Sequence, residues 1–136
     1  MFNKKPKNYT DLLGKTNRIV EGTIINGDII SHADFRLDGQ LMGNFKSEGK
    51  IVIGPAGSVI GKITCKNADI EGKFDGEIRV SELLNLKSTA IIKGQVFCEK
   101  LSVEPNAYFD ATCIMESKPK NNSNDNRKPK PEEKQS

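Results

Sequence analysis

The chain repeats one short pattern along most of its length: a small residue, an apolar residue two positions later, and a second small residue two positions after that. Copies lie at residues 39–43, 57–61, 72–76, 90–94 and 107–111, and a bulged first copy begins at Gly22. The second small residue recurs every 15 to 18 residues. A repeat of this length is too long for a β-hairpin and too short for a pair of helices, but it suits one turn of a parallel β-helix.

Between the repeated small residues the chain alternates with a period of two. From Phe35 to Ile53 every odd position is apolar or small and most even positions are polar, with Met42 and Val52 as exceptions. This period is typical of strands with one buried and one wet face. The sequence therefore predicts an all-β fold, a parallel β-helix of about six triangular rungs, each made of three strands of about three to five residues.

When the copies are aligned rung on rung, the inward positions form three apolar columns, which are the predicted core. Glycine or alanine falls where the strands must bend, because a side chain inside a corner would collide with its neighbours. The first column is Ile24, Leu41, Val59, Phe74, Ile92 and Phe109. The second is Ile29, Phe45, Ile63, Ile78, Val96 and Cys113. The third is Leu37, Ile53, Ile70, Leu86 and Val103.

Charge and composition divide the chain into three parts. Residues 1–18 carry five basic residues and one acidic residue, residues 19–116 carry ten and fourteen, and residues 117–136 carry six and three. We expect a flexible N-terminal segment, a β-helix domain, and a disordered basic tail whose Pro-, Lys- and Asn-rich composition buries too little apolar surface to fold. No apolar run is long enough for a transmembrane helix or resembles a signal peptide, so a cytosolic protein is expected.

The two ends of such a β-helix are the first candidate functional site. Each end has an unpaired backbone edge and a cross-section of apolar core, which natural proteins usually cap. No convincing amphipathic helix flanks residues 19–116. Ile19 and Val20 are expected at one end, and Tyr108 and Phe109 at the other. The residues therefore predict end-to-end self-association, unless the tails fold over the ends or these residues are ordinary terminal core.

Once the rungs are laid out in order, the chain resembles the bactofilins, which are bacterial cytoskeletal proteins. The resemblance covers about residues 1–115. It is carried by the ordered rungs and by the segments 36–39 (Arg-Leu-Asp-Gly), 43–45 (Gly-Asn-Phe), 47–54 (Ser-Glu-Gly-Lys-Ile-Val-Ile-Gly) and 1–5 (Met-Phe-Asn-Lys-Lys).

This resemblance implies a right-handed β-helix that polymerises end to end, without nucleotide or other cofactor, into filaments on the inner membrane. It also implies a role in cell shape, with cell-wall enzymes or another cytoskeletal protein as partners. The last rung departs from the family pattern, because Ala107 and Ala111 occupy the small positions and Cys113 occupies an aliphatic one. Because these residues lie in the last rung, the departure affects the surface through which the C-terminal end would contact another subunit.

The N-terminal peptide is the second candidate functional feature. Met1 and Phe2 could insert among acyl chains, while Lys4, Lys5 and Lys7 lie over anionic headgroups at about 1 kcal/mol per charge. One such signal gives only reversible binding, but a filament that displays it on every subunit gains avidity. Together with the resemblance, the peptide predicts a peripheral protein on the cytoplasmic face of the inner membrane; the alternative is a solvated basic start.

Three features that look like chemical sites have structural explanations. Residues 57–62 differ from a phosphate-binding loop, because three residues rather than four separate the glycines and no Ser or Thr follows Lys62. Cys65 and Cys98 share an inward column about 9.6 Å apart, beyond disulfide reach, and are interpreted as buried apolar residues. His32 falls at a corner. No catalytic, cofactor-binding or metal-binding residue is predicted, and the protein is not expected to be an enzyme.

Other functions are compatible with parts of the sequence. Residues 53–61 locally fit the hexapeptide repeat of left-handed β-helix acyltransferases, although the six-residue step fails within one turn. The basic tail 117–136 could contact phosphates, but its acidic residues and lack of aromatic residues argue against nucleic acid as a partner. Ile30, Phe97 and Ile114 fall in one outward column that would form an apolar strip for bundling or for a partner.

Overall fold

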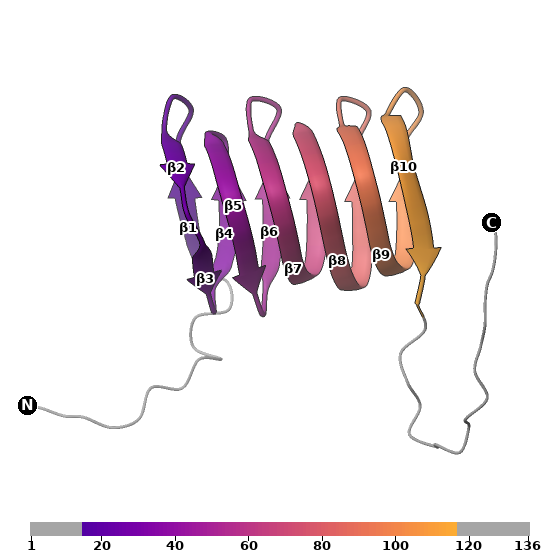
Figure 1. The fold of residues 1–136 in the computed structure, drawn as a ribbon, viewed down its shortest axis with the longest axis horizontal. Helices are drawn as coiled ribbons and strands as arrows, with labels where there is room; N and C mark the ends of the chain where they lie inside the picture. Colours follow the sequence, from indigo (N-terminus) through magenta and orange to yellow (C-terminus); the bar gives the residue numbers. More distant parts are fainter. Residues whose placement is uncertain (1–14, 117–136) are drawn as a thin grey trace, which may run out of the picture.

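The computed structural model describes residues 15–116, which form a single parallel β-helix (Figure 1). Neighbouring strands are parallel throughout, and the described residues contain no helix and therefore none that could cross a membrane. The predicted all-β fold is confirmed. The strands are β1 (Thr16–Ile19), β2 (Ile24–Asn26), β3 (Ile29–Ser31), β4 (Asp34–Leu37), β5 (Gln40–Ser47), β6 (Lys50–Ile53), β7 (Ser58–Ile70), β8 (Lys73–Leu86), β9 (Ile91–Val103) and β10 (Tyr108–Met115).

Each turn passes through three faces, and every face carries six strand segments. Face A holds β1, β4, β6 and residues 67–70, 83–86 and 100–103. Face B holds β2 and residues 40–43, 58–61, 73–76, 91–94 and 108–111. Face C holds β3 and residues 44–47, 62–65, 77–80, 95–98 and 112–115. Six turns at about 4.8 Å each give a rod about 29 Å long.

The winding is right-handed. In Figure 1 the chain advances from left to right while it descends on the near side and ascends on the far side. The left-handed β-helix of the hexapeptide acyltransferases is therefore the wrong interpretation of residues 53–61.

The later turns differ from the predicted three short strands per turn. β7, β8 and β9 each run through all three faces as one strand of 13 or 14 residues. The backbone pairing continues through the corner between faces B and C, where Gly61 is paired with Gly76. Within these strands the register shifts only at the corner between faces C and A, as between Cys65 and Asn67 in β7. A strand therefore continues through a corner wherever the backbone hydrogen bonds to the neighbouring turn are kept.

The predicted core columns are confirmed in the inner turns. Twelve large side chains are essentially fully buried: Phe45, Phe74, Leu37, Leu41, Ile51, Ile53, Ile63, Ile70, Ile78, Leu84, Leu86 and Ile92. The pairing also supplies a fourth column on face A that the repeat did not reveal, made of Phe35, Ile51, Ala68, Leu84 and Leu101. The core therefore follows the axis of the rod as columns of like residues.

Two predicted core residues are wrong, and both lie in terminal turns. Ile24 pairs with Gln40 and points outward, while Ile25 pairs with Leu41 and takes the inward place. The first copy of the repeat has one extra residue between its glycines, which shifts the count. Val103 keeps its predicted register but is 46% exposed, because no further described strand lies on it.

The N-terminal boundary of the β-helix also lies earlier than predicted. Strand β1 begins at Thr16 rather than at Ile19 and pairs along its whole length with β4. Thr16, Asn17 and Arg18 lack the apolar alternation of a buried strand. They are tolerated in β1 because this strand lies at the end of the rod and is mostly exposed.

The corner between faces B and C depends on glycines with positive φ, namely Gly27, Gly43, Gly61, Gly76 and Gly94. A Cβ placed on Gly61 would collide with the carbonyl oxygen of Gly43, and the same contact recurs at each inner turn. Both the left-handed backbone and the close approach therefore require glycine. At the first turn Gly27 has the same conformation, but no atom lies within 4 Å of the place of its Cβ.

This difference gives a matched stability test. Gly61→Ala should lower the free energy of unfolding by about 3–5 kcal/mol, because it adds a backbone collision to the strain of a positive φ. Gly27→Ala should lower it by only about 1–2 kcal/mol, because it carries the strain alone. Urea unfolding followed by circular dichroism measures both values. Equal losses for the two variants would contradict the close stacking at the corner.

Candidate functional site

The two end faces of the β-helix are the places where the core reaches the surface. Core side chains of the inner turns are almost completely buried. The hydrophobic residues that are only partly buried against this core all belong to the first or last turn: Ile19, Ile25, Ile29, Leu101, Ala107, Phe109, Ala111 and Cys113. Among the described residues, the apolar columns therefore run out to both ends without a cover.

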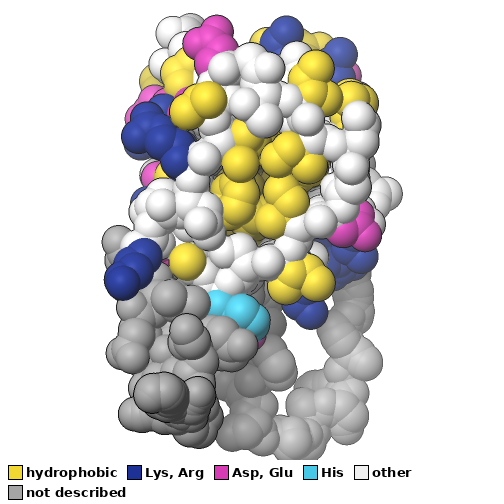
Figure 2. All heavy atoms as spheres, turned by 90° about the vertical axis from the view of Figure 1, so that its left-hand side faces the viewer, with side chains coloured by type: hydrophobic (Ala, Val, Ile, Leu, Met, Phe, Trp, Pro, Cys, Tyr) yellow, Lys and Arg dark blue, Asp and Glu magenta, His cyan; other side chains and the backbone are white. Residues whose placement is uncertain are grey.

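The N-terminal end face is formed by β1, β2 and β3. Figure 2 looks onto this end and shows hydrophobic side chains gathered near its centre, with polar atoms around them. Ile19, Ile25 and Ile29 supply the partly buried layer. Val20 and Ile30 are 58% and 75% exposed at its rim. This face is apolar at the centre, like a section through a protein core.

The C-terminal end face is formed by residues 100–103 of β9 and by β10. Phe109 packs on the core with Leu101 beside it, and both are only partly buried. Tyr108, Ile114 and Met115 are exposed on the same terminal strand. The second end is therefore also apolar, and its layer contains an aromatic side chain, Phe109, which the first layer lacks.

The backbone at both ends is open as well. Each of β1, β2 and β3 pairs with a strand on one side only, and so do β10 and residues 100–103 among the described residues. Such strands present a row of N–H and C=O groups that can pair with another chain. An added β-helix turn would satisfy these groups and cover the apolar centre at once.

Several charged residues at the edge of the end faces form ion pairs with a neighbouring turn. Arg18 in β1 lies 3.9 Å from Asp38. At the other end, Glu104 lies 3.7 Å from Lys87, and Glu116 lies 3.7 Å from Arg79. These are exposed pairs that contribute little stability. They leave the apolar centres of the faces without charge.

The predicted contact residues are all in the terminal turns. Ile19 and Phe109 belong to the partly buried layer, whereas Val20 and Tyr108 lie exposed beside it. The end faces contain further residues that were not predicted to be in contact. These residues are the first or last members of their columns, whereas the prediction considered only residues near the two ends of the domain in the sequence. They are Ile25, Ile29, Leu101, Val103 and Cys113. The predicted lipid-binding residues Met1, Phe2, Lys4, Lys5 and Lys7 and the basic tail 117–136 lie outside the described residues.

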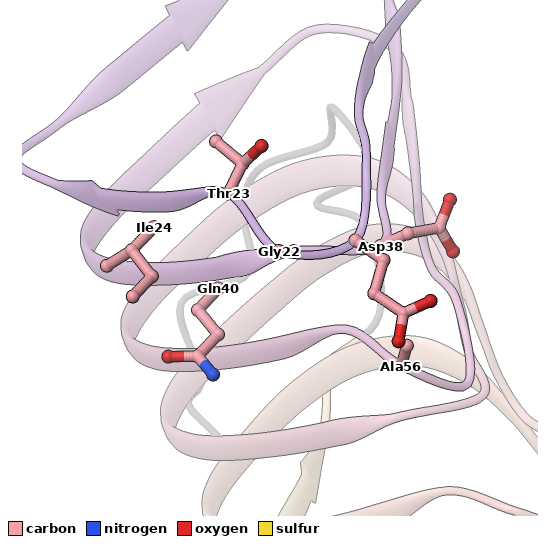
Figure 3. A pocket seen from close by; sticks show the side chains of 8 residues that line it. Gly22, Thr23, Ile24, Asp38, Gln40 and Ala56 are labelled. Carbon is pink, nitrogen blue, oxygen red and sulfur yellow. The ribbon is translucent and has the colours of Figure 1, made fainter.

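A shallow pocket of about 280 Å³ lies beside the N-terminal end face (Figure 3). Its lining comes from the corner between faces A and B: Glu21, Gly22, Thr23, Ile24, Asp38, Gly39, Gln40 and Ala56. Asp38 is engaged by Arg36, whose Nε lies 2.9 Å from its Oδ2. The lining contains no histidine, cysteine or lysine. The pocket is a gap between successive corners of the rod rather than a set of convergent catalytic groups.

Comparison with known proteins agrees with the repeating architecture. The family model for bactofilins, described as polymer-forming cytoskeletal, matches residues 17–114. That stretch begins in β1 and ends in β10, so it contains all six turns. The chain belongs to the bactofilin family.

A curated relative points the same way. Bactofilin BacO from Myxococcus xanthus (strain DK1622) is 23% identical to this bactofilin over 95 residues, which are 70% of this chain and 75% of the relative. No solved structure matches. The identity to this relative is low, which a fold built on alternation and corner glycines tolerates, because each apolar position accepts several residue types.

Ile30, Phe97 and Ile114 lie in one outward column of face C, as predicted, but they do not form a continuous apolar strip. Ile30 is paired with Lys46 and lies far from Phe97, whose neighbours in the same outward column are Arg79 and Ile114. The guanidinium of Arg79 lies 3.9 Å from the centre of the Phe97 ring and leaves that ring only partly exposed. Arg79 also contacts Glu77 at 2.8 Å. Phe97 therefore joins two turns of this bactofilin instead of presenting an apolar strip.

Cys65 and Cys98 occupy the predicted inward column on face C, whereas Cys113 follows Val96 in the neighbouring column. Cys65 is paired with Val80, and Val80 with Cys98. Burial raises the pKa of Cys65 to about 12, and burial together with the neighbouring Cys113 raises the pKa of Cys98 to about 12. Burial also raises the pKa of Cys113. His32 lies at the predicted corner, with Nδ1 3.3 Å from Glu48 Oε1.

These pKa values predict slow thiol chemistry in the folded protein. The thiolate is the reactive form, so a pKa of about 12 leaves Cys65 and Cys98 protonated at pH 8. We expect a disulfide reagent to label partly exposed Cys113 first, and Cys65 and Cys98 at least about 100-fold more slowly than after unfolding in urea. Mass spectrometry of labelled peptides measures the rates. Labelling of native Cys65 as fast as in the unfolded chain would contradict its burial.

Proposed function

We propose that this bactofilin is a structural scaffold, not an enzyme, whose subunits join end to end into filaments without nucleotide. The observation that carries the proposal is that the core columns reach both end faces and are only partly buried there. The polymer-forming character of the family supports it. A second subunit offers what each end face lacks, namely an apolar layer and a row of backbone partners in the same plane.

The energetics favour such a contact. Complete burial of an exposed aliphatic side chain stabilises by about 1.5–3 kcal/mol, so each half-buried member of an end face contributes roughly 1 kcal/mol when covered. Pairing of the open strand edges adds hydrogen bonds of about 0.5–1.5 kcal/mol each. The loss of free tumbling costs about 4–15 kcal/mol, which several such terms together offset.

The charge of the terminal turns allows the two different ends to meet. Residues 15–33 carry Lys15 and Arg18 against Glu21 and Asp28, which makes that turn neutral. Residues 100–116 carry one basic residue against three acidic ones, a net charge of −2. Contact between two N-terminal ends, or between an N-terminal end and a C-terminal end, does not bring strong like charges together. A C-terminal pair meets only modest repulsion between exposed groups.

Charge placed in an end face should therefore stop assembly. We expect Ile25→Arg and Phe109→Arg to remain folded but to form only monomers or short oligomers, because an unpaired guanidinium cannot be buried at low cost. Ile60→Arg is the matched control, since Ile60 is 54% exposed on face B of an inner turn. Negative-stain microscopy and sedimentation measure assembly.

The comparison of the three variants decides the contact surface. Filaments of normal length from Ile25→Arg and Phe109→Arg would exclude the end faces. Loss of filaments in Ile60→Arg alone would indicate that the subunits contact each other through face B instead. Circular dichroism of each variant checks that the β-helix is retained.

We further propose that the filaments lie on the cytoplasmic face of the inner membrane and help to organise cell shape or cell-wall enzymes. The support is the sequence of residues 1–7, in which Met1 and Phe2 precede three lysines. Apolar insertion and about 1 kcal/mol per lysine give a weak anchor for one subunit. A filament that displays one such peptide per subunit binds with avidity.

Two truncations with equal change of charge test the anchor. Deleting residues 1–7 removes a net charge of +3, and deleting residues 117–136 also removes +3. We expect the first deletion to lower co-sedimentation with anionic liposomes at least about tenfold while filaments still form, and the second to have little effect. Unchanged lipid binding after removal of residues 1–7 would rule out the anchor.

A further inference from the structure

Three sulfur atoms meet at the edge of the C-terminal end face. The Sγ atoms of Cys98 and Cys113 lie 3.8 and 3.7 Å from the Sδ atom of Met115. The two thiols are also close enough that each affects the pKa of the other. Met115 is paired with Cys98, and Cys113 with Val96, so the cluster is set by the strand register of β9 and β10. Neither the fold nor the proposed filament contact needs sulfur at these places.

The spacing of the sulfur atoms matches a metal site better than a disulfide. Metal–sulfur bonds of about 2.3 Å place sulfur ligands about 3.8 to 4.0 Å apart in tetrahedral or trigonal geometry. Cys98 and Cys113 are diagonal neighbours on adjacent strands, whose Cα atoms lie roughly 7–8 Å apart. A disulfide needs a Cα separation of about 4.4–6.8 Å, so these two residues cannot close one without moving the terminal strand.

We propose that Cys98, Cys113 and Met115 bind one soft univalent metal ion, Cu(I), at the C-terminal end face. Two thiolates and a thioether are soft ligands, a set that favours Cu(I) over the harder divalent ions. Binding replaces the two thiol protons, which pass to solvent, and leaves the site with a net charge of −1.

The ion reaches the site from the end of the rod. Met115 is 54% exposed and Cys113 is partly exposed, whereas Cys98 lies buried beneath them. Burial raises the pKa of both thiols. Because two protons must leave, the apparent affinity for Cu(I) should rise by up to about 100-fold per pH unit. A subunit stacked on this end would cover the site.

Anaerobic titration of the reduced full-length protein with Cu(I), in competition with bicinchoninate, tests the proposal. We expect one Cu(I) per chain, confirmed by native mass spectrometry. Cys98→Val and Cys113→Val should each weaken binding at least about 100-fold, and Met115→Leu about 10- to 100-fold. Valine suits both cysteine positions because Val80 and Val96 precede them in their columns.

Cys65→Val is the matched control, and it should leave Cu(I) binding unchanged. Cys65 is a buried thiol of the same column, but Val80 separates it from Cys98. Since filament contacts could close the site, the wild type and Phe109→Arg are both titrated. Absence of Cu(I) binding in both would overturn the proposal, and so would an equal loss in Cys65→Val and Cys98→Val. Neither result depends on whether filaments form.

Discussion

Backbone stacking between successive turns is the constraint on which the whole molecule depends. Each strand segment pairs in parallel with the segment one turn before it, and the pairing continues through the glycine corner from Gly43 to Gly61 and Gly76. The carbonyl of one glycine occupies the space that a Cβ would take on the next. Like residues are therefore placed on like residues, and alternation along each strand becomes a set of apolar columns along the rod.

The same stacking is the reason that we place the proposed subunit contact at the ends. Each turn of the rod is covered by another turn of similar shape, so the repeat itself does not specify where a column of stacked residues ends. The described turns end at β1–β3 and at β10, where partly buried apolar residues and open strand edges coincide. The sides of the rod are different. Exposed apolar residues there, such as Met42 and Ile60 on face B, are not a section through the core, and Ile60 is paired with the charged residue Asp75. The end faces are thus the surfaces where a further copy adds the most contact.

Most of the fold could be predicted from spacing and alternation alone. Leu41, Phe45 and Val59 were placed in the right columns because glycines bracket them. The errors arose where the repeat is irregular or polar. The extra residue after Gly22 put Ile24 in the place of Ile25. Polar β1 escaped detection because burial, the source of the pattern, is absent from an outermost turn. The sulfur cluster depends on side-chain directions across two strands, which no linear spacing records.

Diffraction from aligned filaments tests the central claim most directly. If subunits stack end to end as a continuous β-helix, the strands lie across the filament axis, and the pattern has a strong meridional reflection near 4.8 Å. Cryo-electron microscopy of the same filaments should then show subunits about 29 Å long, six strand layers each, with no gap at the junctions. Filaments with strands along the axis, or with junctions wider than one strand spacing, would contradict the account.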